Sequence, residues 1–524
     1  MARTLHLKNF SQTTSMHRGA KTCDLCTISE KKTMKELDEG RFGDLLSWGK
    51  RHGAGINESV EVFYDEATKF SLRVKESTQG PLQAGYAAVT CPASLTLSFA
   101  NALIGGLLPS DLSTDPHPQP QFPSSFMDSL PPHVIGRFFL IQQYLLERDS
   151  LWWPYIQTLP QPEHLASWAL PPFWPEDDLD FLEETNARVA VEEIQANLKR
   201  EFKQARKILK ESNFPGWQTY NRVLYNWAFS IFTSRGFRPS TILSGTKRTQ
   251  ISKLLPPNCE IDDFSVLMPI FDIANHSLES KIIWDSTSDP ESCQLKNEEA
   301  YLPGQQIFNN YGKKTNSELL LGYGFIIDES EKLHNDYIHV RKRQTEAGST
   351  DYSKIATKPT DFLVSLRTLA DPSSLVGRSR QRVAASSDVP VLPEFSHVED
   401  LLVWDLAVAQ ISDNEREALA ELVPAPPGAA SATTDDYLRR LISSPPDPRL
   451  FGVLSKVKGT LLAKLGYDYE RLKGAERDEH SEDSLFPENR NQELAMKYRQ
   501  QCGKVLENAI ASLSSGGTIM EGVN

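Results

Sequence analysis

The sequence has no long apolar run and few cysteines, and both absences exclude classes of protein. No run approaches the roughly 18 apolar residues that a helix needs to cross a bilayer, so we expect no membrane partner. Six cysteines are scattered over 524 residues, unlike the dense framework of a disulfide-stapled secreted domain. This usage favours a reducing compartment, and we expect the protein in the cytoplasm, the nucleus or both.

The cysteines also give little support for a metal site. Cys23 and Cys26 form a lone CxxC pair, with no second pair nearby. A structural zinc site needs four ligands. Free thiols are therefore the favoured interpretation, and we expect no bound metal.

An excess of basic residues is missing as well. The chain has 56 Lys and Arg against 69 Asp and Glu, a formal net charge of −13. A general nucleic-acid-binding protein carries the opposite excess, so we expect no direct nucleic-acid partner. The acidic balance instead favours a basic protein partner or substrate, such as a ribosomal protein, a histone or an elongation factor. We expect the chain to act as a monomer.

The composition is that of a globular protein, and the pattern of apolar and polar residues changes along the chain. Hydrophobic residues make up 39% and charged residues 24%, and the length allows two to four structural units. Residues 1–40 form a tail whose first 22 residues hold basic, Ser and Thr residues and no acid. Organelle transit peptides and ordinary tails share that composition, and both alternatives stay open.

Local patterns predict strands in the first hundred residues and again after residue 261, with helices between and beyond them. Residues 370–390 and 424–435 are rich in Ser, Ala, Pro and Gly and indicate loops or linkers. The predicted strands are 60–64, 70–74, 87–91 and 266–271, and the predicted helices are 42–48, 138–148, 177–211, 220–233, 316–321 and 489–511.

Three short clusters carry the chemistry. They are Ser234–Phe237, Asp272–Ser277, and the pair formed by Asn310–Gly312 and Gly322–Phe325. Taken singly, each has an ordinary structural explanation. An Asn-His turn can serve local hydrogen bonding, and a tyrosine near glycine can pack in a core with its hydroxyl satisfied.

Their order is more specific. The runs SRGF, LMPIFDIANHS and GQQIFNNYGKKTNSELLLGYGF together resemble the SET-domain methyltransferases. The closest resemblance is to the subgroup typified by the Rubisco large-subunit lysine methyltransferase. That subgroup includes fungal ribosomal-protein lysine methyltransferases and the animal actin-histidine methyltransferase. Further matching segments are Trp48 with His52–Ile56, Ser150–Tyr155 and Ala495–Arg499.

The resemblance implies an α+β fold with a split SET domain at residues 41–330. Small β-sheets, with knot-like threading of one segment, would come together around a helical insertion at about 106–260. Residues 340–524 would form an all-α domain similar to the Rubisco-methyltransferase substrate-binding domain. The residue pattern typical of strands resumes near residue 261, which agrees with such a split.

The resemblance also implies a site for S-adenosylmethionine as cofactor. In the family, an Asn-His pair holds the amino-acid part of the cofactor, an arginine meets its carboxylate and an aromatic lies beside the adenine. A tyrosine beside the methyl-transfer channel is catalytic, and a second tyrosine lines that channel. The matching residues here are Asn275, His276, Asp272, Arg235 and Phe325 for the cofactor, Tyr311 for catalysis, and Tyr323 with Arg235 for the substrate.

One segment departs from the family pattern. A turn of the form GxGxxA normally brings backbone atoms to the cofactor, because glycine permits a close approach and unusual dihedral angles. The matching stretch here is Thr68–Val74, in which Lys69 and Ser71 replace the glycines. Phe70 and Leu72 in this stretch are still the residues we expect beside the cofactor.

The implied function is a protein-lysine N-methyltransferase dependent on S-adenosylmethionine. Methyl transfer from a sulfonium is a direct displacement, so it is mainly a positioning task and needs no metal. A lysine amine has a pKa of about 10.4 and must first lose a proton, which a desolvated channel beside a cation favours. Two alternatives remain: a protein-histidine methyltransferase, and a non-catalytic SET-fold protein that binds a partner.

Overall fold

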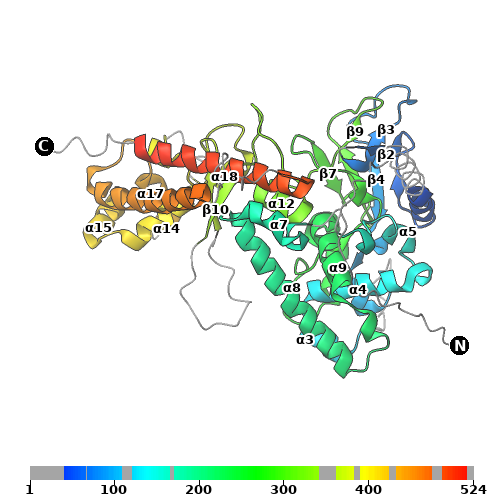
Figure 1. Ribbon diagram of the computed structural model, residues 1–524. Coiled ribbons are helices and arrows are strands. Elements are labelled where there is room, and N and C mark those ends of the chain that lie inside the picture. Colours follow the sequence, from blue (N-terminus) through cyan, green and yellow to red (C-terminus); the bar gives the residue numbers. More distant parts are fainter. Residues whose placement is uncertain are drawn as a thin grey trace, which may run out of the picture.

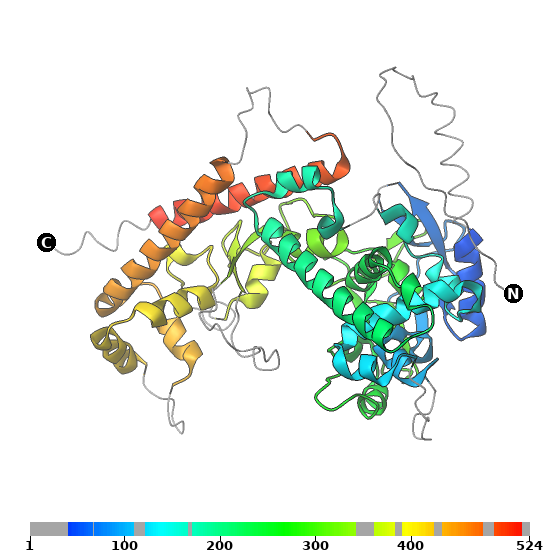
Figure 2. The ribbon, with the colours of Figure 1, turned by 60° about the horizontal axis from the view of Figure 1, so that its bottom comes forward.

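The computed structural model divides into a β-rich part and a helical part joined by long helices. Figure 2 shows the β-rich part at one end and the C-terminal helices at the other, with the green helix α8, Asn186–Glu211, in the middle of the view. The predicted tail and the Cys23–Cys26 pair lie outside the described residues, apart from Gly40. The described residues are 40–66, 68–108, 121–165, 170–341, 361–382, 390–423, 432–474 and 487–515.

Small antiparallel sheets are built from strands on both sides of the predicted insertion. One sheet has the order β1-β4-β8-β7, a second has the order β2-β3-β9, and β5 pairs with β6. In each sheet the early strands pair with strands that follow residue 265, so the two halves come together as the resemblance implied. The strands are β1 Gly55–Ile56, β2 Val60–Asp65, β3 Lys69–Val74, β4 Ala87–Pro92, β5 Leu97–Ser98, β6 Val266–Leu267, β7 Ile282–Asp285, β8 Ser292–Asn297 and β9 Gln306–Ile307.

Helices fill the sequence between these strand groups. Thr185 and Asn221 cap the two long helices α8 and α9, each accepting a backbone N–H with its side chain, which satisfies donors that a helix start leaves free. Helix α9 ends at Arg235 and so delivers this side chain to the sheets. Helical residues 40–51 precede β1; the others are α2 Phe99–Ile104, α3 Ser124–Ser129, α4 Pro132–Leu146, α5 Trp153–Ile156, α7 Glu176–Leu179, α8 Asn186–Glu211, α9 Arg222–Arg235, α10 Pro239–Ile242 and α11 Gly245–Ser252.

The predicted strand at residues 266–271 is wrong beyond Leu267. Pro269 lacks the N–H that a sheet ladder requires, and Ile270 then adopts a φ of +71°. The chain continues as the 3₁₀ helix η7, Phe271–Ile273. This sharp turn carries Asp272 out of the strand direction and toward the end of α9.

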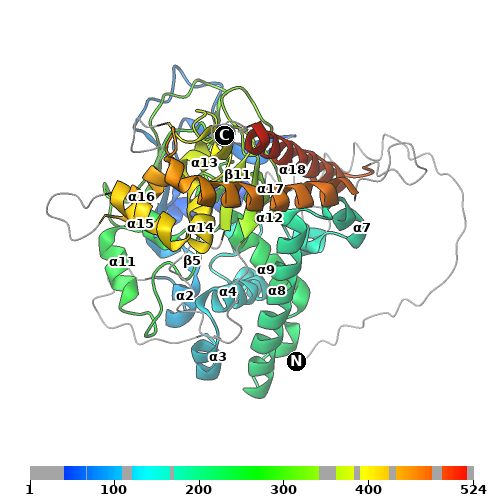
Figure 3. The same cartoon turned by 90° about the vertical axis from the view of Figure 1, so that its left-hand side faces the viewer.

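The expectation of an all-α C-terminal part is also wrong in one respect. Strands β10 Tyr337–Arg341 and β11 Asp361–Ser365 form an antiparallel pair there. The partners are separated by residues 342–360, so a local pattern could not reveal the pairing. Figure 3 shows this part of the molecule in front, with α17 lying lengthwise across the view. The helices around the strand pair are α12 Asn316–Tyr323, α13 Leu375–Arg380, α14 Asp400–Gln410, α15 Asp413–Leu422, α16 Thr434–Leu441, α17 Phe451–Gly474 and α18 Arg490–Ser515.

Two large apolar clusters form the cores of the described residues. The first joins the sheets to α4 and α9, and the second surrounds α17 and α18. Trp174, Leu182 and Val191 lie in the second cluster, together with Leu320 of α12. Part of the predicted insertion therefore packs with the C-terminal helices, and α12 links the second core to the segment that holds Tyr311. The predicted domain limits remain predictions.

No helix in the described stretches is both long and apolar enough to cross a membrane. Within the same stretches, no group of three or more His, Cys, Asp or Glu side chains is arranged to hold a metal ion.

Candidate functional site

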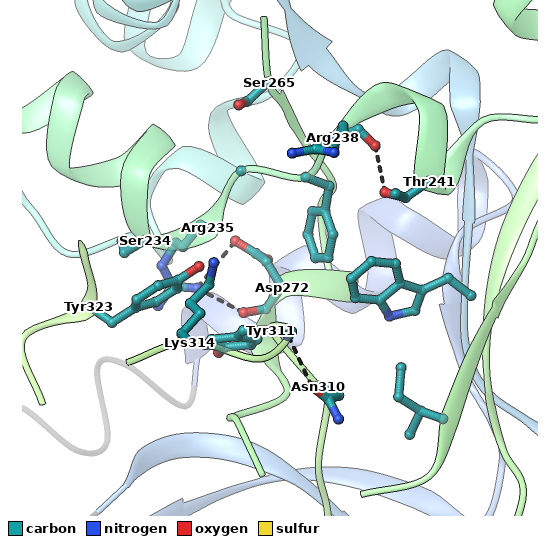
Figure 4. A pocket seen from close by; sticks show the side chains of 15 residues that line it. Ser234, Arg235, Arg238, Thr241, Ser265, Asp272, Asn310, Tyr311, Lys314 and Tyr323 are labelled. Atoms are coloured by element: carbon teal, nitrogen blue, oxygen red, sulfur yellow. Dashed lines mark hydrogen bonds and ion pairs between the residues drawn. The ribbon is translucent and has the colours of Figure 1, made fainter. Parts of the chain in front are cut away.

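A cavity of about 730 Å³ lies where α9, η7, the segment after β9 and α12 meet (Figure 4). Sites that bury small ligands commonly span roughly 300–1,000 Å³. Four predicted site residues line it, from segments far apart in the sequence. The lining residues are Ser234, Arg235, Gly236, Phe237, Arg238, Thr241, Ser265, Asp272, Ile282, Trp284, Asn310, Tyr311, Gly312, Lys314 and Tyr323.

Arg235 and Asp272 form an ion pair at the wall of the cavity. The Arg235 Nη1 donates to the Asp272 backbone oxygen at 3.1 Å and to its Oδ2 at 3.2 Å. The Tyr155 hydroxyl donates to the same Oδ2 at 2.8 Å. Asp272 is 8% exposed, whereas the Arg235 side chain is 29% exposed. The guanidinium is thus fixed on one side and keeps donors free on the other.

The electrostatics of this pair follow from burial and contact. Burial is the largest single effect on the pKa of Arg235 and acts to lower it, but the Asp272 charge together with Tyr155 and Tyr311 raises that pKa overall, so the guanidinium stays charged. Burial raises the pKa of Asp272, with Arg235 and Tyr155 acting against it. The carboxylate is already engaged by two donors, which makes it a positioning group for Arg235.

An aromatic stack holds Tyr311 and Tyr323 in the cavity. The Tyr311 ring stacks on His276, with centroids 4.9 Å apart, and on Tyr323 at 5.0 Å. Phe325 lies at the edge, 6.2 Å from Tyr323 and 6.3 Å from His276. Such offset contacts each stabilise by about 0.5–1.5 kcal/mol beyond burial.

Tyr311 is also tied to the Asn275–His276 segment by hydrogen bonds. Its backbone N–H donates to His276 Nδ1 at 3.0 Å, and its hydroxyl donates to the Ala274 oxygen at 3.1 Å. The backbone N–H of Asn309 donates to the Asn275 oxygen at 2.7 Å. These bonds fix the tyrosine ring relative to the loop that leads out of η7.

The protonation states in the stack suit a neutral aromatic wall. Burial, followed by the Lys314 charge, lowers the pKa of His276 to about 4, which leaves Nδ1 free to accept its hydrogen bond. Burial raises the pKa of Tyr311 above its usual range. Burial and Glu318 raise the pKa of Tyr323 to about 12. Both hydroxyls therefore remain protonated donors at neutral pH.

The segment without glycines keeps the backbone conformation that glycine would supply. Lys69 has a φ of +62°, in the left-handed region, at the first position where the family has glycine. Its side chain folds back, with Nζ donating to the Glu66 oxygen at 2.9 Å. The Asn275 side chain donates to the Thr68 oxygen at 3.1 Å, so this turn contacts the Asn-His segment. Ser71, at the second position, is buried and accepts from Gln306 at 2.9 Å.

Phe70 and Leu72 do not line the cavity, contrary to expectation. Phe70 packs on Phe42 at 4.5 Å and on Tyr64 at 5.2 Å, in a separate hollow. Leu72 is 0% exposed in the central strand of β2-β3-β9. Leu72 belongs to the first apolar core, and this packing keeps it away from the cavity. Four of the nine predicted site residues line the cavity: Arg235, Asp272, Tyr311 and Tyr323. His276 packs on Tyr311, and Phe325 packs on Tyr323. Asn275 contacts Thr68.

Several residues of the site were not predicted, and two of them are Tyr155 and Lys314. Tyr155 holds Asp272, and Lys314 lines the cavity with Nζ 5.8 Å from the Tyr323 ring centroid. Both lie within runs that carry the family resemblance, so their position in the sequence was visible. Their contacts were not, because Tyr155 and Asp272 are 117 residues apart.

The donor set fits the cofactor that the fold family implies. Arg235 offers guanidinium donors toward the cavity, which suit a carboxylate. Tyr311, Tyr323 and Phe325 offer aromatic surface and hydroxyls, which suit a planar base and a positively charged sulfur. The residues present therefore match S-adenosylmethionine in chemical type.

No family model matches the chain, but individual proteins do. It is 31% identical over 204 residues to the ribosomal lysine N-methyltransferase set10 of Schizosaccharomyces pombe, a match that covers 39% of this chain and 33% of that protein. It is 23% identical over 302 residues to the actin-histidine N-methyltransferase of Homo sapiens, covering 56% and 43%. The chain thus spans about a third to under half of these relatives' length.

Solved structures agree with these matches. The structure of Rubisco LSMT bound to AdoMet aligns with a TM-score of 0.54 and 15% identity, over 91% of this chain and 92% of that one. The LSMT SET domain bound to lysine and AdoHcy aligns with the same score over 92% and 93%. At such identity the likeness shows the fold. The predicted resemblance to the SET-domain, Rubisco LSMT-like group is confirmed.

Proposed function

We propose that this protein is a protein-lysine N-methyltransferase that uses S-adenosylmethionine. The observation that carries the proposal is a single cavity lined by Arg235, fixed by Asp272, and by Tyr311, stacked on His276. Curated relatives with partial matches are protein-lysine methyltransferases. When bound, S-adenosylmethionine supplies a methyl group already activated on a positively charged sulfur.

The chain's own residues bind and orient. Arg235, held from behind by Asp272, presents its exposed edge to a carboxylate. Tyr311 is fixed at its backbone by His276 and at its hydroxyl by Ala274. A tyrosine held at both ends keeps an incoming nucleophile on one line of approach, which is where most of the rate enhancement of such a transfer arises.

The cavity also favours the neutral form of an amine. Among the described residues that line it, Arg235, Arg238 and Lys314 are cations and Asp272 is the one acid. Cationic neighbours and desolvation both lower the pKa of an amine. A substrate lysine entering this cavity therefore loses its proton to water more readily, and a dedicated base is not required.

The histidine-directed alternative rests on the match to the actin-histidine N-methyltransferase, which spans more of this chain than the set10 match. Imidazole is already largely neutral at pH 7, so the same cationic lining accepts it. The non-catalytic alternative relied on the missing glycines and on the long C-terminal half, which is poor in motifs. The left-handed φ of Lys69 weakens it, because the turn retains the required backbone form.

The substrate is proposed to be a protein, with a ribosomal protein as first candidate because of the set10 match. The basic character of that substrate, a monomeric state and a cytoplasmic or nuclear location remain predictions.

The test is methyl transfer from isotopically labelled S-adenosylmethionine to proteins of a cell lysate. We expect a small number of labelled bands, with label on lysine in mass spectra. The matched control is Tyr311→Phe, which keeps the ring stack and removes the hydroxyl. Label on histidine would support the alternative, and absence of any label with the wild-type protein would overturn the proposal.

A further inference from the structure

We propose that the residue methylated by this protein is flanked in its substrate by acidic side chains, which Lys314 and Arg238 bind at the cavity mouth. The inference rests on the proposed function and specifies its substrate class. It concerns the few residues around the target, whereas the net charge of −13 concerns the whole molecule.

The local charge at the cavity is opposite to that of the molecule. Its ionised lining residues are three cations, Arg235, Arg238 and Lys314, and one acid, Asp272. Asp272 is nearly buried and already holds Arg235 and Tyr155. Asp272 therefore does not neutralise Lys314 or Arg238, and the one further acid close to either of them in the described residues is Asp262, 4.0 Å from Arg238, so positive charge is in excess at the opening of the cavity.

Lys314 has no acidic partner among the described residues. Its Nζ lies 5.8 Å from the centroid of the Tyr323 ring, at the wall of the cavity (Figure 4). Its backbone is fixed, because the Asn335 side chain donates to the Lys314 oxygen at 2.6 Å and Thr315 begins α12 with a capping box. Lys314 is therefore a cation on a fixed backbone beside Tyr323. In this position it can bind a carboxylate that lies next to the target residue in the substrate.

Arg238 is the second available cation. Its side chain is 69% exposed, and its nearest acid, Asp262, lies 4.0 Å away. That carboxylate also accepts from Ser240, which donates its backbone N–H at 2.9 Å and its hydroxyl at 2.6 Å, so its contact with Arg238 is a loose one at the limit of ion-pair distance. Figure 4 shows Arg238 and Lys314 on different parts of the cavity wall.

The cofactor does not account for these two cations. Its single carboxylate is matched by Arg235, whose exposed edge lies beside the Asp272 turn. Its sulfonium and ammonium groups are positive and would add to the charge of the mouth. An acidic side chain on each side of the target residue would neutralise Lys314 and Arg238, whereas a basic flank would be repelled.

The experiment has two stages on the full-length protein. The methylated sites found in the lysate are first located by mass spectrometry. Peptides of about 15 residues around each site are then compared in three forms: natural, with flanking acids changed to Gln or Asn, and with those acids changed to Lys. We expect Asp or Glu near the target and a rise in KM of about two- to fivefold for each neutralised acid, with little change in kcat.

Variants of the enzyme identify the partner. Lys314→Glu should raise KM for the natural peptide and lower it for the Lys-flanked peptide, a reversal that a merely structural role would not produce. Arg238→Glu should do the same at the other flank. Lys207→Glu on α8, outside the cavity lining, is the charge-matched control and should leave both values unchanged.

Each outcome has a distinct meaning. Methylation at sites without flanking acids, or KM values that do not respond to the acids, overturns this inference and leaves the methyltransferase proposal standing. A loss of affinity for S-adenosylmethionine in Lys314→Glu, equal to its change in KM, assigns Lys314 to the cofactor and also overturns it. Absence of any methyl transfer overturns the proposed function and this inference together.

Discussion

The backbone N–H of Tyr311 donates to His276 Nδ1 at 3.0 Å, and the two rings stack with an interplanar angle of 15°. Two motifs that are 35 residues apart in the sequence thus form one unit. The unit places the Tyr311 hydroxyl on the Ala274 oxygen and one face of its ring against Tyr323. The catalytic assignment of Tyr311 and the cofactor assignment of His276 are therefore linked by geometry.

Removing the Tyr311 hydroxyl should abolish most turnover and leave the fold intact. Tyr311→Phe keeps both ring stacks and the backbone bond to His276. It loses only the hydroxyl group, whose removal from a positioned site commonly costs on the order of 10²-fold in rate. Turnover is measured with labelled cofactor and stability by thermal unfolding. Wild-type turnover in this variant would refute the catalytic role.

Acid should remove a contribution of His276 to stability. The pKa of His276 is about 4 in the folded protein and about 6.5 in an unfolded chain, so the unfolded state binds the extra proton first. The stability from neutral His276 is fully present above pH 6.5 and is lost as the pH falls toward 4.

The measurement is the difference in unfolding free energy between the wild type and His276→Phe, which stacks but cannot titrate. We expect this difference to shrink by up to about 3 kcal/mol between pH 6.5 and pH 4. A difference independent of pH across this range would show that His276 does not carry the shift.

Asp272 should act on the cofactor through Arg235. Asp272→Asn keeps the shape of the side chain and removes the charge that holds the guanidinium, so we expect about tenfold weaker binding of S-adenosylmethionine by calorimetry. Asp262→Asn removes an acid outside the lining as a control. Equal affinities in Asp272→Asn and the wild type would contradict the positioning role.

Lys69 should tolerate glycine and reject a β-branched residue. A non-glycine residue in the left-handed region costs about 1–2 kcal/mol, while glycine costs about 0.5–1 kcal/mol in chain entropy. Lys69→Gly should therefore be neutral or stabilising by up to about 1 kcal/mol, and Lys69→Val should destabilise. The check is chemical denaturation of both variants. Strong destabilisation by glycine would show that the Lys69 side chain supports the turn.

The sequence allowed the site to be predicted where order along the chain carried the information. Arg235, Asp272, Tyr311 and Tyr323 were placed in one site by motif order, and the structure brings them to one cavity. Leu72 was misplaced because packing in the first apolar core, rather than its motif, decides where its side chain lies.

Contacts across long separations could not be predicted. Nothing near Tyr155 in the sequence indicates that its hydroxyl meets Asp272. The pairing of β10 with β11 was not predicted for the same reason, because residues 342–360 separate the two strands in the sequence. The left-handed φ of Lys69 was hidden by its residue type, because a lysine gives no local signal for that conformation.

The central claim is that the cavity beside Arg235 and Tyr311 holds the methyl donor. Its most direct test is calorimetric titration of S-adenosylmethionine into the wild type and into Arg235→Ala. We predict one site per chain in the wild type and markedly weaker binding in the variant, which loses the guanidinium but keeps Tyr311. Absence of binding to the wild type at millimolar concentration, or equal affinity in the two proteins, would contradict it.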